Sequence, residues 1–160
     1  MNTTTTASND GGKKEERKQS GTYEAGCHCG YIKFSVTLSP PFPVYKVLNC
    51  NCSVCSHLGY LLVYPKAKDV AWHNNSRERC ASYRFNTKQK DQMFCPKCGA
   101  SLGIDFESVF KEHTYGINAR TFYGLNLDEL EYKKGDGVNK VPPAGDLSGH
   151  VWDEDAQELK

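Results

Sequence analysis

Cysteine residues gather in three short motifs along this sequence. The motifs are Cys27-His28-Cys29, Cys50-Asn51-Cys52-Ser53-Val54-Cys55 and Cys95-Pro96-Lys97-Cys98, and Cys80 stands alone. Thiols at such short spacings are typical of metal ligands. Disulfide frameworks belong instead to secreted proteins, and this sequence has neither an apolar leader nor an apolar run long enough to span a membrane. We therefore expect a cytosolic or nuclear protein with reduced thiols that bind metal.

The third motif, followed by Gly99, has the spacing of a zinc knuckle, in which a tight turn brings two thiolates onto one ion. A redox dithiol shares this spacing, but it expects a thioredoxin-like βαβ context that the surrounding sequence lacks. The first motif can supply two further ligands, because residues i and i+2 of an extended segment point to the same side. We predict a closed structural zinc site that is coupled to folding. Its ligands are Cys27, Cys29, Cys95 and Cys98.

The middle motif offers three thiolates, from Cys50, Cys52 and Cys55, and no obvious fourth ligand. Three protein ligands are typical of catalytic zinc, whose remaining position takes water or substrate. Zinc in such a site lowers the pKa of a bound water or thiol and polarises a carbonyl group. We predict a catalytic zinc at this motif. The alternative is a second structural site, completed by Cys80, His57 or His28.

Short β-like segments predict a mainly β domain around these motifs. Residues 31–38 alternate apolar and polar side chains, and residues 58–64 and 114–119 are rich in aromatic and aliphatic residues. No stretch shows a long period of 3.6 residues, although residues 125–132 can form a short helix or turn. Beyond Lys133 the sequence is rich in Gly, Pro and Asp, which predicts an extended tail.

We place one domain over residues 21–145, between two tails. Residues 1–20 have almost no large apolar side chains, which predicts disorder. Residues 146–160 form a C-terminal tail, in which Trp152 docks on the domain or on a second subunit of a homodimer. The net charge of +1, from 20 basic and 19 acidic side chains, leaves no excess positive charge for phosphate groups. We therefore expect neither nucleic acid nor a membrane as a partner.

The cysteine motifs and the residues around them resemble a known family. The matching pieces are Gly26-Cys-His-Cys-Gly30, Cys50-Asn-Cys-Ser-Val-Cys55, Gly59-Tyr-Leu-Leu-Val-Tyr64, Tyr83-Arg-Phe-Asn86, Met93-Phe-Cys-Pro-Lys-Cys-Gly99 and Ile117-Asn-Ala-Arg120. Over roughly residues 23–133, the sequence resembles the glutathione-dependent formaldehyde-activating enzymes and the related centromere protein V domains. It is most similar to the fungal branch of that family.

The resemblance implies an Mss4-like fold of packed antiparallel sheets built around zinc sites. It also implies one zinc on each of the two cysteine sets, as the spacing predicts. The named activity of the family is the condensation of formaldehyde with glutathione to S-hydroxymethylglutathione, formally a carbon–sulfur lyase reaction. The implied cofactors are two zinc ions, and the implied partners are glutathione as co-substrate and a small electrophile.

Two departures from the family pattern adjoin the metal sites. Ser56-His57 follows the middle motif where relatives often carry Arg, Lys or Thr, and Asp91-Gln92-Met93 precedes the knuckle where a His is common. His57 is a candidate proton donor or acceptor beside the catalytic zinc, and a surface position is the alternative. Glutathione carries two carboxylates, so its site needs cationic groups. The candidates are Arg84, Lys46 and Arg120.

Two other functions fit the same residues. One is the same chemistry on a glutathione adduct of a xenobiotic or a secondary metabolite, because nothing in the sequence separates formaldehyde from a larger electrophile. The other is a non-catalytic binding module in which both zinc ions are structural. Whether a thiol can reach the ion at the middle motif separates the enzymes from the binding module.

Overall fold

The computed structural model describes residues 19–140 and 152–159 of the 160-residue chain. The N-terminal tail predicted for residues 1–20 therefore lies outside the described residues, except for its last two. Residues 146–151 of the predicted C-terminal tail also lie outside them.

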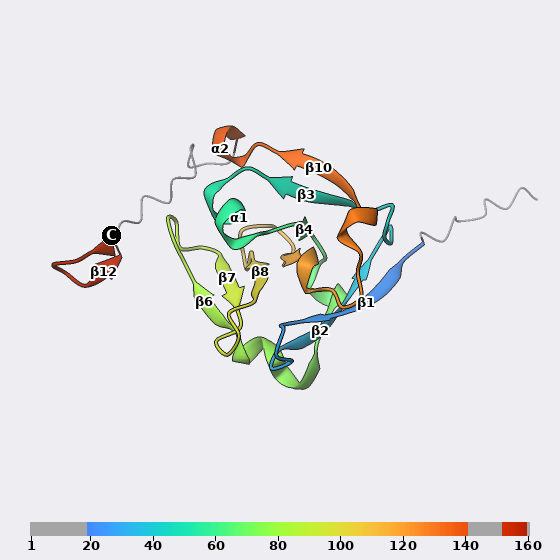
Figure 1. The fold of residues 1–160 in the computed structure, drawn as a ribbon, viewed down its shortest axis with the longest axis horizontal. Coiled ribbons are helices and arrows are strands. Elements are labelled where there is room, and N and C mark those ends of the chain that lie inside the picture. The colour runs from blue at the N-terminus through green and yellow to red at the C-terminus, as the bar shows by residue number, and fades with distance from the viewer. Residues whose placement is uncertain (1–18, 141–151, 160) are drawn as a thin grey trace, which may run out of the picture.

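Strands make up most of the regular structure (Figure 1). In chain order they are β1 (Gly21–Gly26), β2 (Lys33–Leu38), β3 (Lys46–Cys50), β4 (Leu62–Val63), β5 (Val70–Trp72), β6 (Ala81–Tyr83), β7 (Asp91–Phe94), β8 (Ser101–Asp105), β9 (Tyr115–Asn118), β10 (Glu131–Gly135), β11 (Trp152–Asp153) and β12 (Glu158–Leu159). The helical segments are short. They are α1 (Ser53–Leu58), α2 (Gly137–Lys140) and the 3₁₀ segments η1 (Ala67–Asp69), η2 (His73–Arg79), η3 (Ala119–Thr121) and η4 (Leu127–Glu129).

The strands form two main sheets. One has the order β1-β2-β5, and the other has the order β10-β3-β4-β9-β8-β7-β6. Neighbouring strands run antiparallel except β3 and β10, which are parallel from the Lys46–Glu131 pair to the Cys50–Gly135 pair. The predicted mainly β, Mss4-like fold class is confirmed, with this parallel pair as an addition to the expected antiparallel sheets.

Several predicted segments match strands, and others differ. The alternation over residues 31–38 becomes β2, and residues 114–119 contain β9. Residues 125–132 contain the 3₁₀ segment η4. Residues 58–64 differ, because α1 ends at Leu58, Gly59 takes a left-handed φ of +66°, and β4 is only two residues long. The residues of this apolar run are largely buried, both at the end of the helix and in the short strand, so the run alone does not indicate a strand.

The extended tail predicted beyond Lys133 is wrong for its first residues. β10 continues to Gly135, and α2 follows directly. The first four residues of β10 are exposed, so hydrogen bonds to β3 rather than apolar burial hold this strand. Such a strand leaves no apolar pattern in the sequence. Further along, β11 and β12 pair as a hairpin in which Trp152 is exposed, and its docking stays a prediction.

The seven-stranded sheet presents its two faces to different apolar clusters. The main core joins Val47, Val63, Met93 and Ile117 of this sheet to Phe34 and Val36 of the three-stranded sheet. The smaller cluster contains Cys55, Tyr60, Leu62, Ile104 and Phe106. Adjacent residues of β4, Leu62 and Val63, belong to different clusters because successive side chains of a strand point to opposite faces. The second face is therefore available for a site.

A β-bulge in β8 lets this strand serve both clusters. The register between β7 and β8 shifts after the Met93 pair, so Leu102 is an extra residue. Leu102 packs in the main core, whereas Ile104, two residues later, belongs to the smaller cluster. Gly103 between them has a φ of +137°, and a Cβ there would lie 2.0 Å from the backbone oxygen of Gly116. Only glycine fits this bulge.

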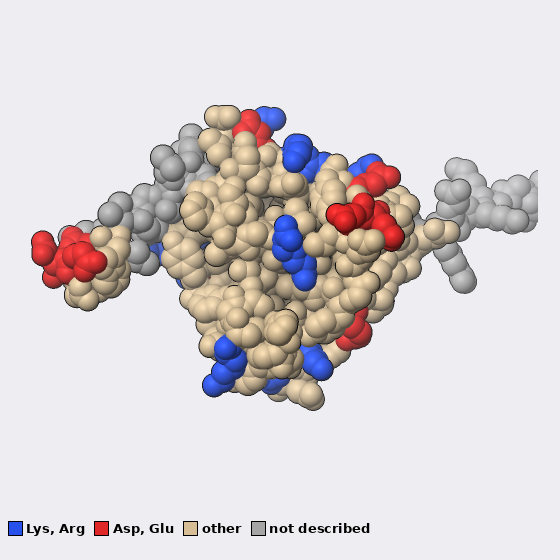
Figure 2. All heavy atoms as spheres, in the orientation of Figure 1, with Lys and Arg blue, Asp and Glu red and all other residues tan. Residues whose placement is uncertain are grey.

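Charges of both signs are interspersed on the surface. On the face shown in Figure 2, basic and acidic side chains lie among uncharged ones. Over residues 19–140 and 152–159, no helix combines the length and the hydropathy that a membrane span needs.

The bulge gives a first testable prediction. Gly103→Ala will lower the free energy of unfolding by more than about 3 kcal/mol, because the new Cβ overlaps a backbone atom that cannot move aside. Gly124→Ala is the matched control, since Gly124 also has a positive φ, of +69°, but its Cβ would meet nothing within 4 Å. The control will lose only about 1 kcal/mol. Urea unfolding at fixed zinc concentration measures the free energy of unfolding of both variants. Equal losses of stability in the two variants would contradict the bulge at Gly103.

Candidate metal centres and the pocket beside them

Two tight turns bring together the four cysteines of the predicted closed site, Cys27, Cys29, Cys95 and Cys98. The first turn follows β1, and Gly30 with a φ of +80° lets the chain reverse toward β2. The second follows β7, and Gly99 with a φ of +75° does the same before β8. In each turn a backbone N–H donates to the first sulfur, from Ile32 to Cys27 at 3.2 Å and from Lys97 to Cys95 at 3.4 Å.

The spacing of the four sulfurs fits a tetrahedral metal ion. The Sγ atoms of Cys27 and Cys29 are 3.6 Å apart, those of Cys29 and Cys95 are 3.8 Å apart, and all four lie within 4.8 Å of one another. Zinc–sulfur bonds of about 2.3 Å in tetrahedral geometry place sulfurs about 3.8 Å apart. Disulfide sulfurs would be about 2 Å apart, and all four cysteines are free. The donor set therefore suits zinc.

Electrostatics in this cluster also favour a cation. Backbone N–H groups of Cys29 and Ala100 lower the pKa of Cys98 to about 6. The N–H of Tyr31 lowers the pKa of Cys29, but desolvation and the neighbouring thiols outweigh it and raise this pKa to about 11. Four adjacent thiols cannot all ionise without a compensating positive charge. A divalent cation supplies that charge and releases the remaining protons.

The local conformation of Cys27 and Cys29 differs from the one expected. Residues 27–32 form a turn rather than an extended segment. The two sulfurs still meet, because the left-handed Gly30 closes the turn. His28 is exposed at the tip of this turn.

The second cluster joins the end of a strand to the start of a helix. Cys50 ends β3, Cys52 is the N-cap of α1, and Cys55 lies within α1. Their sulfurs all lie within 4.8 Å of one another. A hydrogen bond with the Cys52 thiol, burial, and the charges of Cys52 and Cys50 raise the pKa of Cys55. This set also fits a cation, which would replace the proton that Cys55 otherwise keeps.

The segment after β10 packs directly against this second cluster. A Cβ on Gly137 would lie 2.7 Å from the sulfur of Cys50 and 2.8 Å from the Cβ of Cys52, so only glycine fits. The side chain of Asn51 donates to Asp136 at 2.8 Å and accepts from a backbone N–H of α2 at 3.2 Å. Asn51 thus fastens α2 over the three thiols.

No fourth His, Cys, Asp or Glu side chain joins these three sulfurs within residues 19–140 and 152–159. His57 is exposed, and its Nδ1 lies 2.8 Å from the backbone oxygen of Ser53 in its own helix. The thiol of Cys80 donates to the backbone oxygen of Ser76 at 3.7 Å, and Cys80 packs against the main core. The three residues named as alternative fourth ligands therefore do not complete this cluster.

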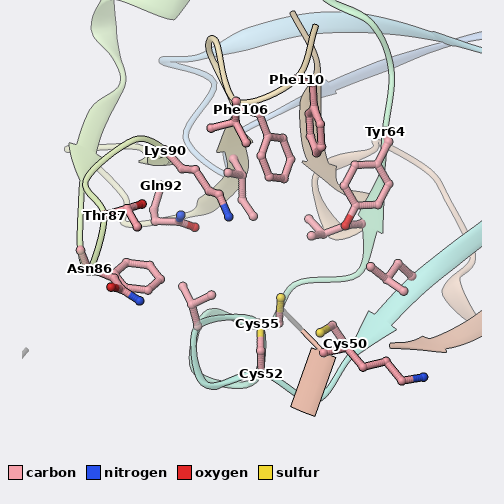
Figure 3. Close-up of a pocket in the computed structure, with 17 residues that line it drawn as sticks. Cys50, Cys52, Cys55, Tyr64, Asn86, Thr87, Lys90, Gln92, Phe106 and Phe110 are labelled. Atoms are coloured by element: carbon pink, nitrogen blue, oxygen red, sulfur yellow. The ribbon is translucent and has the colours of Figure 1, made fainter. Parts of the chain in front are cut away.

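A cavity of about 680 Å³ opens beside the three cysteines (Figure 3). Cys50, Cys52 and Cys55 lie on one side of it, and Phe106 and Phe110 lie on the other. The remaining apolar wall includes Leu62, Tyr64, Phe85 and Ile104. The polar lining residues are Asn86, Thr87, Lys90, Gln92 and Lys140. His57 does not line the cavity.

Arg84 connects the two loops that form the far wall of the cavity. Its guanidinium pairs with Asp91 at the start of β7 and with Glu107 after β8, and it donates to the backbone oxygen of Lys88 at 3.0 Å. The loop from Phe85 to Lys90 and the loop after Phe106 are thereby held together. Arg84 was a predicted glutathione ligand, yet it contacts these protein groups and does not line the cavity.

The other two predicted glutathione ligands also lie outside the cavity lining. Lys46 pairs with Glu131 across the parallel strands β3 and β10. Arg120 donates from Nε to the backbone oxygen of Gly59 at 3.0 Å. Lys46 thus joins β3 to β10, and Arg120 holds the glycine that caps the end of α1.

Sequence reasoning missed the lining residues Lys90, Gln92, Ile104 and Phe106. Lys90 directly precedes β7 and Gln92 lies in it, and Ile104 lies in β8 and Phe106 directly follows it. Residues at i and i+2 of a strand share a face. Pairing those two segments through the knuckle would have placed all four on one face. Lys140 had no such signal, because α2 lies where a tail was predicted.

Comparison with known proteins agrees with this architecture. The family model for the glutathione-dependent formaldehyde-activating enzyme matches residues 22–131, which contain both cysteine clusters. A crystal structure of a Rhodobacter sphaeroides protein is similar with a TM-score of 0.54 and 22% sequence identity, over 69% of this chain and 99% of that chain. At that identity the likeness concerns the fold alone. By the family match, this chain belongs to the glutathione-dependent formaldehyde-activating enzyme family.

Proposed function

We propose that this chain is a zinc-dependent carbon–sulfur lyase that acts on glutathione and formaldehyde, or on a related glutathione adduct. The observation that carries the proposal is the set of three thiols, without a fourth protein ligand, beside a cavity with apolar walls. Family membership supports glutathione as the thiol and formaldehyde as the electrophile. In the forward direction the thiol sulfur bonds to the carbonyl carbon, and the thiol proton moves to the carbonyl oxygen.

The two clusters have different roles in this proposal. The cluster of Cys27, Cys29, Cys95 and Cys98 holds a structural zinc, because four thiolates leave no coordination position for a substrate. The cluster of Cys50, Cys52 and Cys55 holds the catalytic zinc. At its one open position, zinc bound there would either lower the pKa of the incoming thiol or polarise the aldehyde oxygen.

Residues of the cavity position the reactants. The aromatic and aliphatic walls exclude water, so polar interactions within the cavity are stronger than in solution. The amide oxygen of Gln92 accepts from the hydroxyl of Tyr60 at 3.1 Å. This bond holds the Gln92 side chain in the cavity lining.

A larger glutathione adduct is the second candidate substrate. The cavity volume of about 680 Å³ lies in the range of sites for drug-sized ligands. Formaldehyde, with two heavy atoms, fills little of it even when glutathione is bound. A non-catalytic binding module would bind a ligand in the same cavity without converting it. Activity measurements distinguish this module from both enzymes.

Loss of one ligand from the four-cysteine cluster will unfold the domain. Cys95→Ser removes a buried thiolate from a site whose metal binding is coupled to folding, so we expect insoluble or unfolded protein. Cys80→Ser is the control, because Cys80 lies outside both clusters, and it will cost no more than about 1.5 kcal/mol. Circular dichroism and thermal unfolding report the result. A folded Cys95→Ser protein with unchanged melting would refute the structural assignment.

Loss of one ligand from the three-cysteine cluster will separate stability from activity. Cys52→Ala will keep the fold, because the other cluster remains intact and the Cys52 side chain makes no capping bond to α1. The variant will lose thiol-dependent turnover of aldehydes or glutathione adducts.

Exchange NMR with formaldehyde and glutathione measures this turnover against the uncatalysed addition. Metal-free protein and Cys80→Ser are run beside the wild type. A wild-type rate equal to background would remove the formaldehyde activity. If the spectrum of cobalt-substituted protein were also unchanged by glutathione, the binding module would replace the enzyme.

A further inference from the structure

Apart from the three thiols, the charged side chains that line the cavity are basic. Lys90 and Lys140 line it, and no acidic side chain does so among the described residues. The amine of Lys90 lies 5.6 Å from the centre of the Phe106 ring, and Figure 3 shows it directed into the cavity. Within residues 19–140 and 152–159, the ion pairs formed by lysines involve Lys46, Lys66 and Lys68, and neither cavity lysine is among them. The Lys90 amine is therefore available to an anionic ligand, and Lys140, whose charge also acts on the nearby Asp136 carboxylate, is the second cation of the lining.

The wall that faces the thiols is aromatic. The ring centres of Phe106 and Phe110 are 4.9 Å apart, and those of Phe106 and Tyr64 are 6.0 Å apart. Gly116 makes room for this cluster, because a Cβ there would lie 3.0 Å from the Phe106 ring. Phe110 is nevertheless 47% exposed. Because Phe110 also lines the cavity, an apolar group bound there would cover part of its ring, and formaldehyde would cover little of it.

We infer that the preferred substrate is the glutathione hemithioacetal of a large apolar aldehyde. This inference rests on the proposed function. Lys90 and Lys140 bind the two carboxylates of the glutathione part, and the cluster of Tyr64, Phe106 and Phe110 binds the side chain of the aldehyde. The carbon–sulfur bond forms as the thiol proton moves to the carbonyl oxygen, or breaks in reverse, so no oxidant is needed.

The charge and the shape of the cavity agree in this assignment. Carboxylates attract lysines, and no Asp or Glu side chain lines the cavity among the described residues. The thiols lie across the cavity from Phe106 and Phe110, so a carbon held near them can extend its substituent toward the rings. Lys140 lies beyond residues 22–131, the span of the family match. The second cation is therefore a feature of this chain outside the matched segment.

Binding of unreactive thioethers tests the inference without turnover. Isothermal titration calorimetry of the zinc-loaded protein will compare S-methylglutathione with S-hexylglutathione. We expect the hexyl compound to bind at least about tenfold more tightly, because its added methylenes are buried against the rings. Phe110→Ala will weaken S-hexylglutathione more than S-methylglutathione and so bring the two affinities close together. Val44→Ala, at an exposed site outside the cavity, is the control.

The lysines are tested with the same two ligands. Lys90→Gln and Lys140→Gln will each weaken both ligands about tenfold, through loss of a charge-assisted hydrogen bond, and will keep the ratio between them. Lys68→Gln makes the same charge change outside the cavity and will alter neither affinity. Equal affinity of the wild type for the two thioethers, binding of neither, or unchanged affinity in both lysine variants would overturn the inference.

Turnover distinguishes this inference from the proposed function. Tight, lysine-dependent binding of S-hexylglutathione, with no acceleration of aldehyde addition, would uphold the ligand class and remove the lyase. Acceleration of the formaldehyde reaction without a preference for the hexyl compound would uphold the lyase and overturn the ligand class.

Discussion

The sulfurs of Cys29 and Cys95 lie 3.8 Å apart although 66 positions separate them along the chain. Their two turns connect β1 to β2 in one sheet and β7 to β8 in the other. A metal ion held by both turns would fix the distance between the two sheets at these two loops, each of which contains a glycine with positive φ. Because four thiols in one place need a compensating charge, the folded state and the bound ion stabilise each other.

That constraint frees the opposite face of the large sheet for function. The face toward the main core carries residues such as Met93 and Ile117, whereas the other face carries Gln92 and Leu62. The three thiols, α2 and the two loops joined by Arg84 enclose the cavity on that second face. A substitution in the cavity therefore changes few contacts of the main core. We expect the free energy of unfolding and the activity to depend on different residues.

Sequence reasoning reached the cysteine clusters because ligand spacing is a local property. Each of the two predicted ligand sets comes together in the fold: Cys27, Cys29, Cys95 and Cys98 in one, and Cys50, Cys52 and Cys55 in the other. It did not reach the cavity, whose lining comes from the ends of β7 and β8 and from α2. The i and i+2 spacing within each segment was visible in the sequence, but the pairing of β7 with β8, with its bulge at Leu102, depends on the fold.

The basic residues show the same limit. Arg84 and Lys46 were plausible anion ligands by charge alone, but each has a carboxylate partner within the chain. Lys90 and Lys140 differ only in the surroundings that the fold gives them. Charge is thus a poor guide to binding until the partner of each side chain is known.

The central claim is that the two cysteine clusters bind metal independently, one for the fold and one for chemistry. Native mass spectrometry of protein purified without chelator tests it most directly. We expect two zinc ions per chain in the wild type and one in Cys52→Ala, with the folded charge-state distribution kept in both. One zinc in the fully occupied wild type, or loss of both ions from Cys52→Ala, would contradict it.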